Sequence, residues 1–369
     1  MAKAKRSDKG EGSVYQSKNG SWVAEIRTGG KRKVFYGKAE SEVKKKLKAY
    51  KTELIKNDYV EVKKRTVKDY MDDWLYNTQV HTLKPKSFDL KEGTLQNQIY
   101  PYIGNLQMGN VTSNDIQRLI NDLVAKKLSY STIRKAYDAL NACFKLGILK
   151  SELVKNPCAG VVLPSNSKKS MSDIRFFDDD EIKKICEESL RKYNTGKNFY
   201  RLGNAIILML YTGIRVGECL ALKWTDINWD KKTIHVHANA VEVINRERRI
   251  EDSDKKYIIL YQDTTKTEAG HRYVHLNQKA VNALLALKEV NGKHEYVACS
   301  QTGKLQGHKN IDRMFDCILT HCNINPCGVH ALRHTFASML FKKGVDVKTV
   351  SELLGHKDVS VEHRRFPIG

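Results

Sequence analysis

The chain has 369 residues, 41% of them hydrophobic and 29% charged, which is enough for two or three domains with real cores. No apolar run approaches the roughly 20 residues of a membrane-spanning helix. No apolar stretch follows the charged N-terminus, as a secretory signal requires. These features argue against a membrane or secreted protein and predict a cytoplasmic location.

The net charge of +22 is unevenly distributed. Residues 1–65 hold 19 basic and 8 acidic side chains, a net +11 in less than a fifth of the chain. Such a concentration favours a polyanionic partner, with nucleic acid as the leading candidate. An acidic membrane surface is disfavoured because no amphipathic helix with a Trp/Leu face accompanies the charge.

The eight cysteines are scattered along the chain. Cys317, Cys322 and Cys327 come closest together, next to His321, but they form no Cys-x-x-Cys pair. This spacing matches no common zinc pattern, so we predict no metal and interpret these cysteines as buried thiols or small helix residues.

Residues 13–37 alternate apolar and polar side chains between the turn signals Asn19-Gly20 and Gly29-Gly30. They predict three short strands, followed by a lysine-rich helix at about 39–56. The exposed face of this sheet is expected to carry Arg27, Lys31, Arg32 and Lys33. A small β-domain with a charged surface and a sheet that enters a DNA groove both remain open.

Residues 62–155 show apolar side chains at helical spacing, with N-caps at Thr112 or Ser113 and at Ser129 or Ser131. We predict a helical bundle over 61–158 and a Pro-containing linker over 159–174.

Residues 175–369 predict an α+β domain. Helices are expected at 178–192, 198–212, 215–223, 277–290, 308–322, 329–343 and 347–354, and strands at 233–243, 255–262 and 272–276. The predicted fold class is thus multidomain and mainly α, with small β-sheets.

Four basic signals stand out in this third region. They are YTGIRVGECLAL with Arg215, TTKTEAGHRYVHL with Lys266, HALRHT with His330 and Arg333, and LLGHKD with His356. Each signal by itself is weak, since an Arg at a helix start or a Lys in a hairpin is most often a surface residue.

Together and in this order, the four signals resemble the tyrosine recombinase family, the lambda-type integrases. The resemblance implies an arm-type DNA-binding domain at 1–60, a core-binding domain at 61–158 and a catalytic domain at 175–369. The N-terminal module resembles that of integrases from conjugative transposons. The activity implied is cutting and rejoining of DNA through a 3′-phosphotyrosyl intermediate, without cofactor or metal.

The resemblance also implies a role for each residue. Two permanently charged guanidiniums, Arg215 and Arg333, hold the non-bridging phosphate oxygens by bidentate hydrogen bonds. Lys266 on its hairpin is the general acid for the leaving oxygen. His330 relays a proton from the nucleophile, and His356 bonds a non-bridging oxygen. Glu218 orients a basic residue.

The chain departs from the family at the nucleophile. The family places a tyrosine about nine or ten residues after Leu-Gly-His, where this sequence has Arg365 and Phe366, and the last tyrosine is Tyr296. A Tyr-to-Phe change, and a truncated or altered C-terminus, both account for this. We favour the second explanation because the VEHRRFPIG ending is unlike the family.

The expected partner is double-stranded DNA at core and arm sites. We predict contacts from Trp22, Arg27, Lys31, Arg32 and Lys33 of the sheet and from Lys84, Lys86 and Arg134 of the bundle. The resemblance further suggests a homo-oligomer on DNA, from dimer to tetramer, and an excision factor.

Two other functions remain as alternatives. A DNA-binding protein without catalysis, derived from an integrase, would have no use for the complete set of basic residues. Residues 330–354 alone would also pass for a helix-turn-helix. A type IB topoisomerase shares the active site, but the separate N-terminal module argues against it.

Overall fold

The structure is a computed structural model, and it describes residues 13–17, 19–28, 31–165, 175–246, 255–263 and 271–355. The chain divides into two compact units, residues 1–167 and 168–369. The division falls inside the predicted linker, 159–174. Across the described segments, no helix is both long enough and apolar enough to cross a bilayer.

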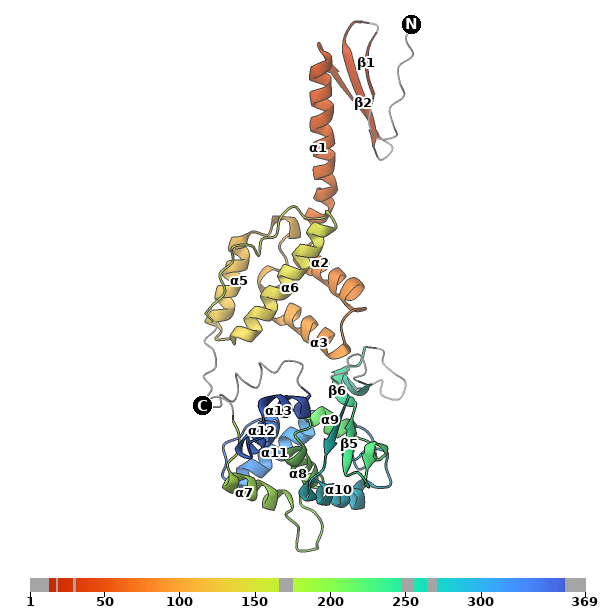
Figure 1. Cartoon of the computed structure of the whole chain (residues 1–369). Coiled ribbons are helices and arrows are strands. Elements are labelled where there is room, and N and C mark those ends of the chain that lie inside the picture. The colour runs from red at the N-terminus through yellow and green to blue at the C-terminus, as the bar shows by residue number, and fades with distance from the viewer. Residues whose placement is uncertain are drawn as a thin grey trace. The chain divides into compact units, whose positions relative to one another are not determined.

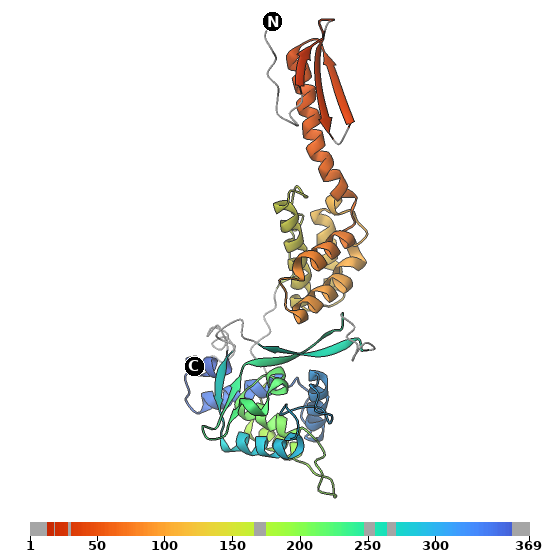
Figure 2. The same cartoon turned by 90° about the vertical axis from the view of Figure 1, so that its right-hand side faces the viewer.

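An antiparallel sheet and one long helix form the N-terminal module (Figures 1 and 2). The three strands are those predicted, β1 (Ser13–Gln16), β2 (Trp22–Thr28) and β3 (Lys31–Gly37), in the order β1-β2-β3. The helix α1 (Glu40–Lys64) is longer than predicted. Its Val43 and Leu47 cover Ala24 and Ile26 of the sheet, and the four form a small buried core.

The helical region confirms the predicted bundle and has its own core, separate from that of the sheet. Its elements are α2 (Val67–Asp73), α3 (Pro85–Thr94), α4 (Tyr100–Ile103), α5 (Ser113–Ala125) and α6 (Tyr130–Leu149), with π-helical turns at Trp74–Gln79 and Leu95–Ile99 and a 3-10 turn at Met108–Asn110. Of the paired alternatives, Thr112 and Ser129 are the N-caps, each accepting a backbone N–H from three residues ahead.

The second unit contains helices and two small antiparallel sheets. The helices are α7 (Asp179–Ser189), α8 (Gly203–Thr212), α9 (Val216–Ala221), α10 (Gln278–Asn291), α11 (His308–His321), α12 (His330–Lys342) and α13 (Val347–Leu354). The strands are β4 (Ile227–Asn228), β5 (Thr233–Val236), β6 (Ala238–Ile244), β7 (Tyr257–Asp263) and β8 (Arg272–His275), arranged as β4-β5-β8 and β6-β7. Figure 2 shows β6 and β7 as a long ribbon.

Two predicted elements of this unit need correction. The strand expected at 233–243 is two strands, β5 and β6, which pair in different sheets. An alternating apolar run indicates strand structure but does not reveal which partner each half will find. The helix expected from residue 198 begins at Gly203.

Helix α8 is the centre of this unit, in contact with α7, α9, α10 and α12. Every residue of α8 is buried, as expected for a helix that is apolar all round. It ends at Gly213, whose φ of +66° is left-handed. A Cβ there would lie 2.4 Å from the Phe336 ring, so only glycine fits this turn.

We predict that Gly213→Ala destabilises the second unit far more than Gly196→Ala. Gly196 has a similar φ of +78° but open space around it, so its replacement costs only the left-handed backbone strain, about 1 kcal/mol. Gly213→Ala adds crowding against Phe336, about 1–3 kcal/mol more. Urea denaturation of both variants measures the difference, and equal destabilisation would contradict the packing described here.

Candidate active site

Arg215 is the N-cap residue of α9, directly after the turn that ends α8. Its backbone N–H donates to Glu218 Oε2 at 2.8 Å, so the Glu218 side chain caps this helix. Its guanidinium Nη1 donates to Glu218 Oε1, also at 2.8 Å. Glu218 therefore fixes both the backbone and the side chain of Arg215, while 38% of the Arg215 side chain stays exposed.

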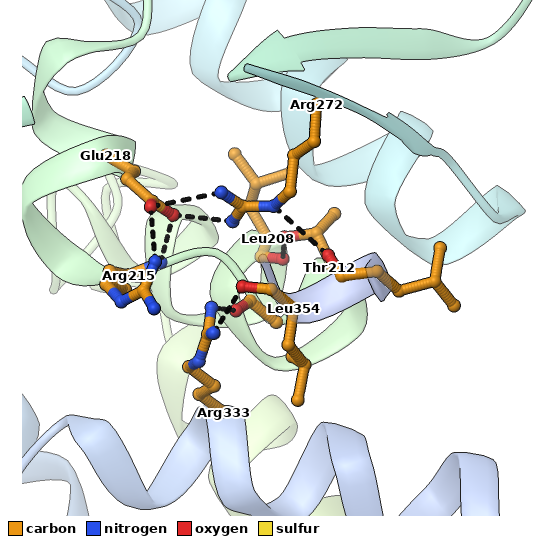
Figure 3. A network of polar contacts seen from close by, with 9 residues as sticks. Leu208, Thr212, Arg215, Glu218, Arg272, Arg333 and Leu354 are labelled. Carbon is orange, nitrogen blue, oxygen red and sulfur yellow. Dashed lines mark hydrogen bonds and ion pairs between the residues drawn. The ribbon is translucent and has the colours of Figure 1, made fainter. Parts of the chain in front are cut away.

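Glu218 has a second cationic partner, Arg272 at the start of β8. The Arg272 Nη1 and Nη2 donate to the two carboxylate oxygens at 3.1 and 2.7 Å. Figure 3 shows the carboxylate between the two guanidiniums. Burial alone would raise the pKa of Glu218, but the hydrogen bonds and charge of Arg272, with those of Arg215, lower it to about 2. A carboxylate that ionises this readily is a poor general base at neutral pH.

Arg333 lies in α12 with only 2% of its surface exposed. Its Nη1 donates to the Gly213 carbonyl oxygen at 2.8 Å, and its Nη2 donates to the Leu354 carbonyl oxygen (Figure 3). Gly213 is two residues before Arg215, and Leu354 is the last residue of α13. Arg333 therefore joins the turn before α9 to the end of α13, where a cation also complements the helix dipole.

His330, the first residue of α12, differs from Arg333 in its environment. It is exposed, and its ring centroid lies 4.9 Å from that of His334. Of the predicted pair on this helix, His330 is thus open to solvent and Arg333 is inside.

Lys266, His356, Arg365 and Phe366 lie outside the described residues, so their roles stay predictions. The predicted hairpin around Lys266 needs correction, because β7 before it pairs with β6 and β8 after it pairs with β5. The segment that carries Lys266 therefore joins two sheets. Alternation and turn residues in the sequence mark two strands but do not show that the two pair with each other.

The open face of the N-terminal sheet carries Arg32. Its Nε donates to Glu25 Oε2 at 3.0 Å, and Tyr15 donates to the same oxygen at 3.3 Å. Arg32 is exposed, and an anion that binds it competes with the surface ion pair to Glu25. The side chains of Arg27 and Lys31, also predicted here, lie outside the described residues.

Two predicted DNA contacts in the sheet lie on the side of α1 instead. Lys33 pairs across the strands with Ile26 of the small core, and its Nζ lies 5.8 Å from the centre of the Tyr50 ring. Trp22 packs against the same core. The expectation that Lys33 shares the exposed face is wrong, because successive side chains of a strand alternate between faces.

The three predicted contacts of the bundle are exposed. Lys84 and Lys86 stand at the start of α3. Arg134 lies on α6, where its Nε donates to Asp138 at 2.9 Å. An anion that binds Arg134 therefore competes with a surface ion pair, which costs little to break.

Arg272 was not among the predicted site residues, although the sequence contains a signal for it. In the strand RYVH, Val274 is buried whereas Tyr273 and His275 are exposed. Arg272 shares the inward face with Val274, and an inward-facing arginine requires a buried anionic or carbonyl partner.

The arrangement suits recognition of an anion by guanidiniums. Glu218 holds the backbone and one Nη of Arg215, the Arg215 side chain stays partly exposed, and Arg333 donates from inside to the turn that precedes it. Within the described ranges, no three His, Cys, Asp or Glu side chains are grouped so that they could hold a metal ion.

The low pKa of Glu218 predicts a specific acid response. Its folded pKa of about 2 lies below the ordinary value of 4.5, so its contribution to stability is complete above that value and is lost as the pH falls. We expect wild-type stability to fall more steeply than that of Glu218→Gln between about pH 5 and pH 3. Urea midpoints measure this, with Glu352→Gln on the exposed face of α13 as the control. Parallel pH profiles for wild type and Glu218→Gln would contradict the network.

Comparison with known proteins identifies the family. The phage integrase family model matches residues 175–364, and the model of the phage integrase N-terminal SAM-like domain matches residues 66–124. A tyrosine recombinase XerC-like protein of Caldanaerobacter subterraneus is 31% identical over 350 residues, covering 89% of this chain and 86% of the relative.

Solved structures agree in fold. The Tn1549 transposon integrase bound to a circular intermediate DNA matches with a TM-score of 0.67 at 18% identity, over 82% of this chain and 95% of the other. A lambda integrase dimer bound to a core site matches with a TM-score of 0.62 at 18% identity, over 96% and 94% of the two chains. The family-model match over residues 175–364 and the long relative together show that this chain belongs to the phage integrase family and is a tyrosine recombinase.

Proposed function

We propose that this chain is the integrase of a mobile genetic element and acts at specific sites in duplex DNA. The observation that carries the proposal is that Arg333 bonds the turn at Gly213, two residues before the partly exposed Arg215, in a tyrosine recombinase. The relative named as a transposon integrase supports the assignment to a mobile element.

The proposed chemistry depends on positive charge next to the scissile phosphate. Attack on a phosphodiester spreads negative charge over the non-bridging oxygens, and guanidiniums stabilise it in a site that is already organised. Arg215 and Arg333 are proposed to bind these oxygens, Lys266 to protonate the leaving oxygen, and His330 and His356 to assist proton transfer and oxygen binding. Glu218 is proposed to position Arg215.

The nucleophile is proposed to be absent from this chain. A family member attacks with a tyrosine, and the sequence has Arg365 and Phe366 at the expected places, with no tyrosine after Tyr296. The chain would then bind its site and hold the scissile phosphate without forming the covalent intermediate. The alternative, a DNA-binding regulator derived from an integrase, is favoured by this same observation.

Recognition of DNA is proposed to involve both N-terminal domains. The net charge of +11 in residues 1–65, the exposed Arg32 and the exposed Lys84 and Lys86 support this. Lambda integrase was solved as a dimer bound to a core site and as a tetramer bound to a Holliday junction, which supports assembly of this chain into dimers and tetramers on DNA. An excision factor remains a prediction.

We predict that the chain forms no covalent adduct with DNA, whereas Arg365→Tyr or Phe366→Tyr does. The substrate is a nicked duplex selected for binding to the chain, and the readout is a shifted band on a denaturing gel. The adduct should form in EDTA, because guanidiniums supply the charge at phosphorus. A shifted band from the unmodified chain would show that the nucleophile has been misplaced.

The matched control is Arg215→Ala in whichever tyrosine variant is active. This change should lower adduct formation by at least about 100-fold, because it removes stabilisation specific to the transition state. Duplex affinity should change little, since most of it comes from many phosphate contacts. Loss of all DNA binding in Arg215→Ala would mean that its assigned role is wrong.

A further prediction concerns salt. Affinity of the whole chain for duplex DNA should fall by at least about tenfold between 50 and 200 mM salt, because bound phosphates release counterions. Fluorescence anisotropy with a labelled duplex measures it. An affinity independent of salt would contradict a phosphate-dominated interface.

A further inference from the structure

Arg272 makes three side-chain hydrogen bonds next to the proposed phosphate site. Its side chain is 9% exposed, and its Nε donates to the Leu353 carbonyl oxygen at 3.1 Å. Its two Nη atoms donate to the two oxygens of Glu218. Arg272, the first residue of β8, thus links the last turn of α13 to α9. The segment that carries Lys266 directly precedes β8.

Positive charges outnumber negative charges around Glu218. One carboxylate, with a side chain 9% exposed, contacts two guanidiniums. Arg272 makes a two-point contact, whereas Arg215 makes a single side-chain contact through Nη1. Because a two-point pair satisfies both oxygens, Arg272 is the principal counter-ion of Glu218, and Arg215 retains donors and net positive charge for another anion.

Removal of Arg272 would change this balance. A buried carboxylate without a counter-ion is costly, so Glu218 would take Arg215 as its full partner. The resulting one-to-one pair would neutralise Arg215 and direct its donors inward. A phosphate would then lose the cation that faces it, although Arg215 itself is unaltered.

We infer that Arg272 is a positioning residue that keeps Arg215 available for phosphate by occupying Glu218. This inference rests on the proposed function. It also assigns Arg272 a mechanical role, since its bond to Leu353 ties the end of α13, directly before Gly355 and His356, to the same carboxylate.

A second substitution, Glu218→Gln, tests whether Arg272 acts by occupying Glu218. If Arg272 only stabilised the fold, Glu218→Gln added to Arg272→Ala would change the stability of the chain without restoring phosphate binding at Arg215. If Arg272 acts by occupying Glu218, the neutral glutamine no longer captures Arg215. Glu218→Gln should then suppress the binding defect of Arg272→Ala.

The experiment uses the full chain labelled with ¹⁵N-arginine and titrated with inorganic phosphate. The Arg215 Nε–H signal, assigned by its loss in Arg215→Lys, reports phosphate at that side chain. Arg272→Ala should weaken phosphate binding by about tenfold, and Arg272→Lys, which keeps the charge but not the two-point contact, by less. The double variant should recover most of the lost affinity.

Thermal midpoints measured on the same samples separate stability from binding. Arg272→Ala and Glu218→Gln/Arg272→Ala both lose the bond to Leu353, so the thermal midpoint of both should lie below that of wild type. Only Arg272→Ala should bind phosphate poorly. If Arg272→Ala does not fold, the comparison of Arg272→Lys with Glu218→Gln/Arg272→Lys gives the same test.

The outcomes are distinguishable. A wild-type chain whose Arg215 signal does not respond to phosphate would overturn the proposed site and this inference with it. A wild-type response together with a double variant no better than its Arg272 single variant would overturn the inference alone.

Discussion

The ionised carboxylate of Glu218, enclosed between two guanidiniums, is the interaction on which the proposed site in the second unit depends. It caps α9, fixes Arg215 and anchors Arg272, and Arg272 in turn holds the end of α13. A buried charge of this kind is stable only with its partners in place, so removal of one partner destabilises the others. Arg333 strengthens the same arrangement from inside by binding the Gly213 and Leu354 carbonyl groups.

This arrangement explains how arginines can serve as binding groups without collapsing onto the nearest acid. An arginine that faces an empty site next to a carboxylate would simply pair with it. Here a second arginine shares the carboxylate, so the exposed one is oriented without being fully neutralised. The chain as a whole has a net charge of +22. The site where a phosphate is proposed to bind likewise has more positive than negative charge.

Much of this organisation could be predicted from the sequence. Hydrophobic periodicity and capping residues located nearly every helix, with α13 matching the predicted 347–354 at both ends. The motifs identified Arg215, Glu218 and Arg333 because their residue types and order are distinctive. Periodicity could not separate β5 from β6, since strand pairing is a long-range property. Lys33 was predicted on the wrong face. It is the neighbour of Arg32 in β3 and the cross-strand partner of Ile26, so strict alternation places it on the side of α1. Arg272 was missed because its role depends on contacts with α9 and α13, which are distant in sequence.

The central claim is the proposal that Arg215 and Arg333 bind a single phosphodiester of duplex DNA. A crystal structure of the full chain bound to a duplex selected for affinity tests it most directly. The account predicts one phosphate within hydrogen-bond distance of both guanidiniums, with Arg272 still paired to Glu218. A complex in which Arg215 contacts only Glu218, and the nearest phosphate is bound elsewhere, would contradict it.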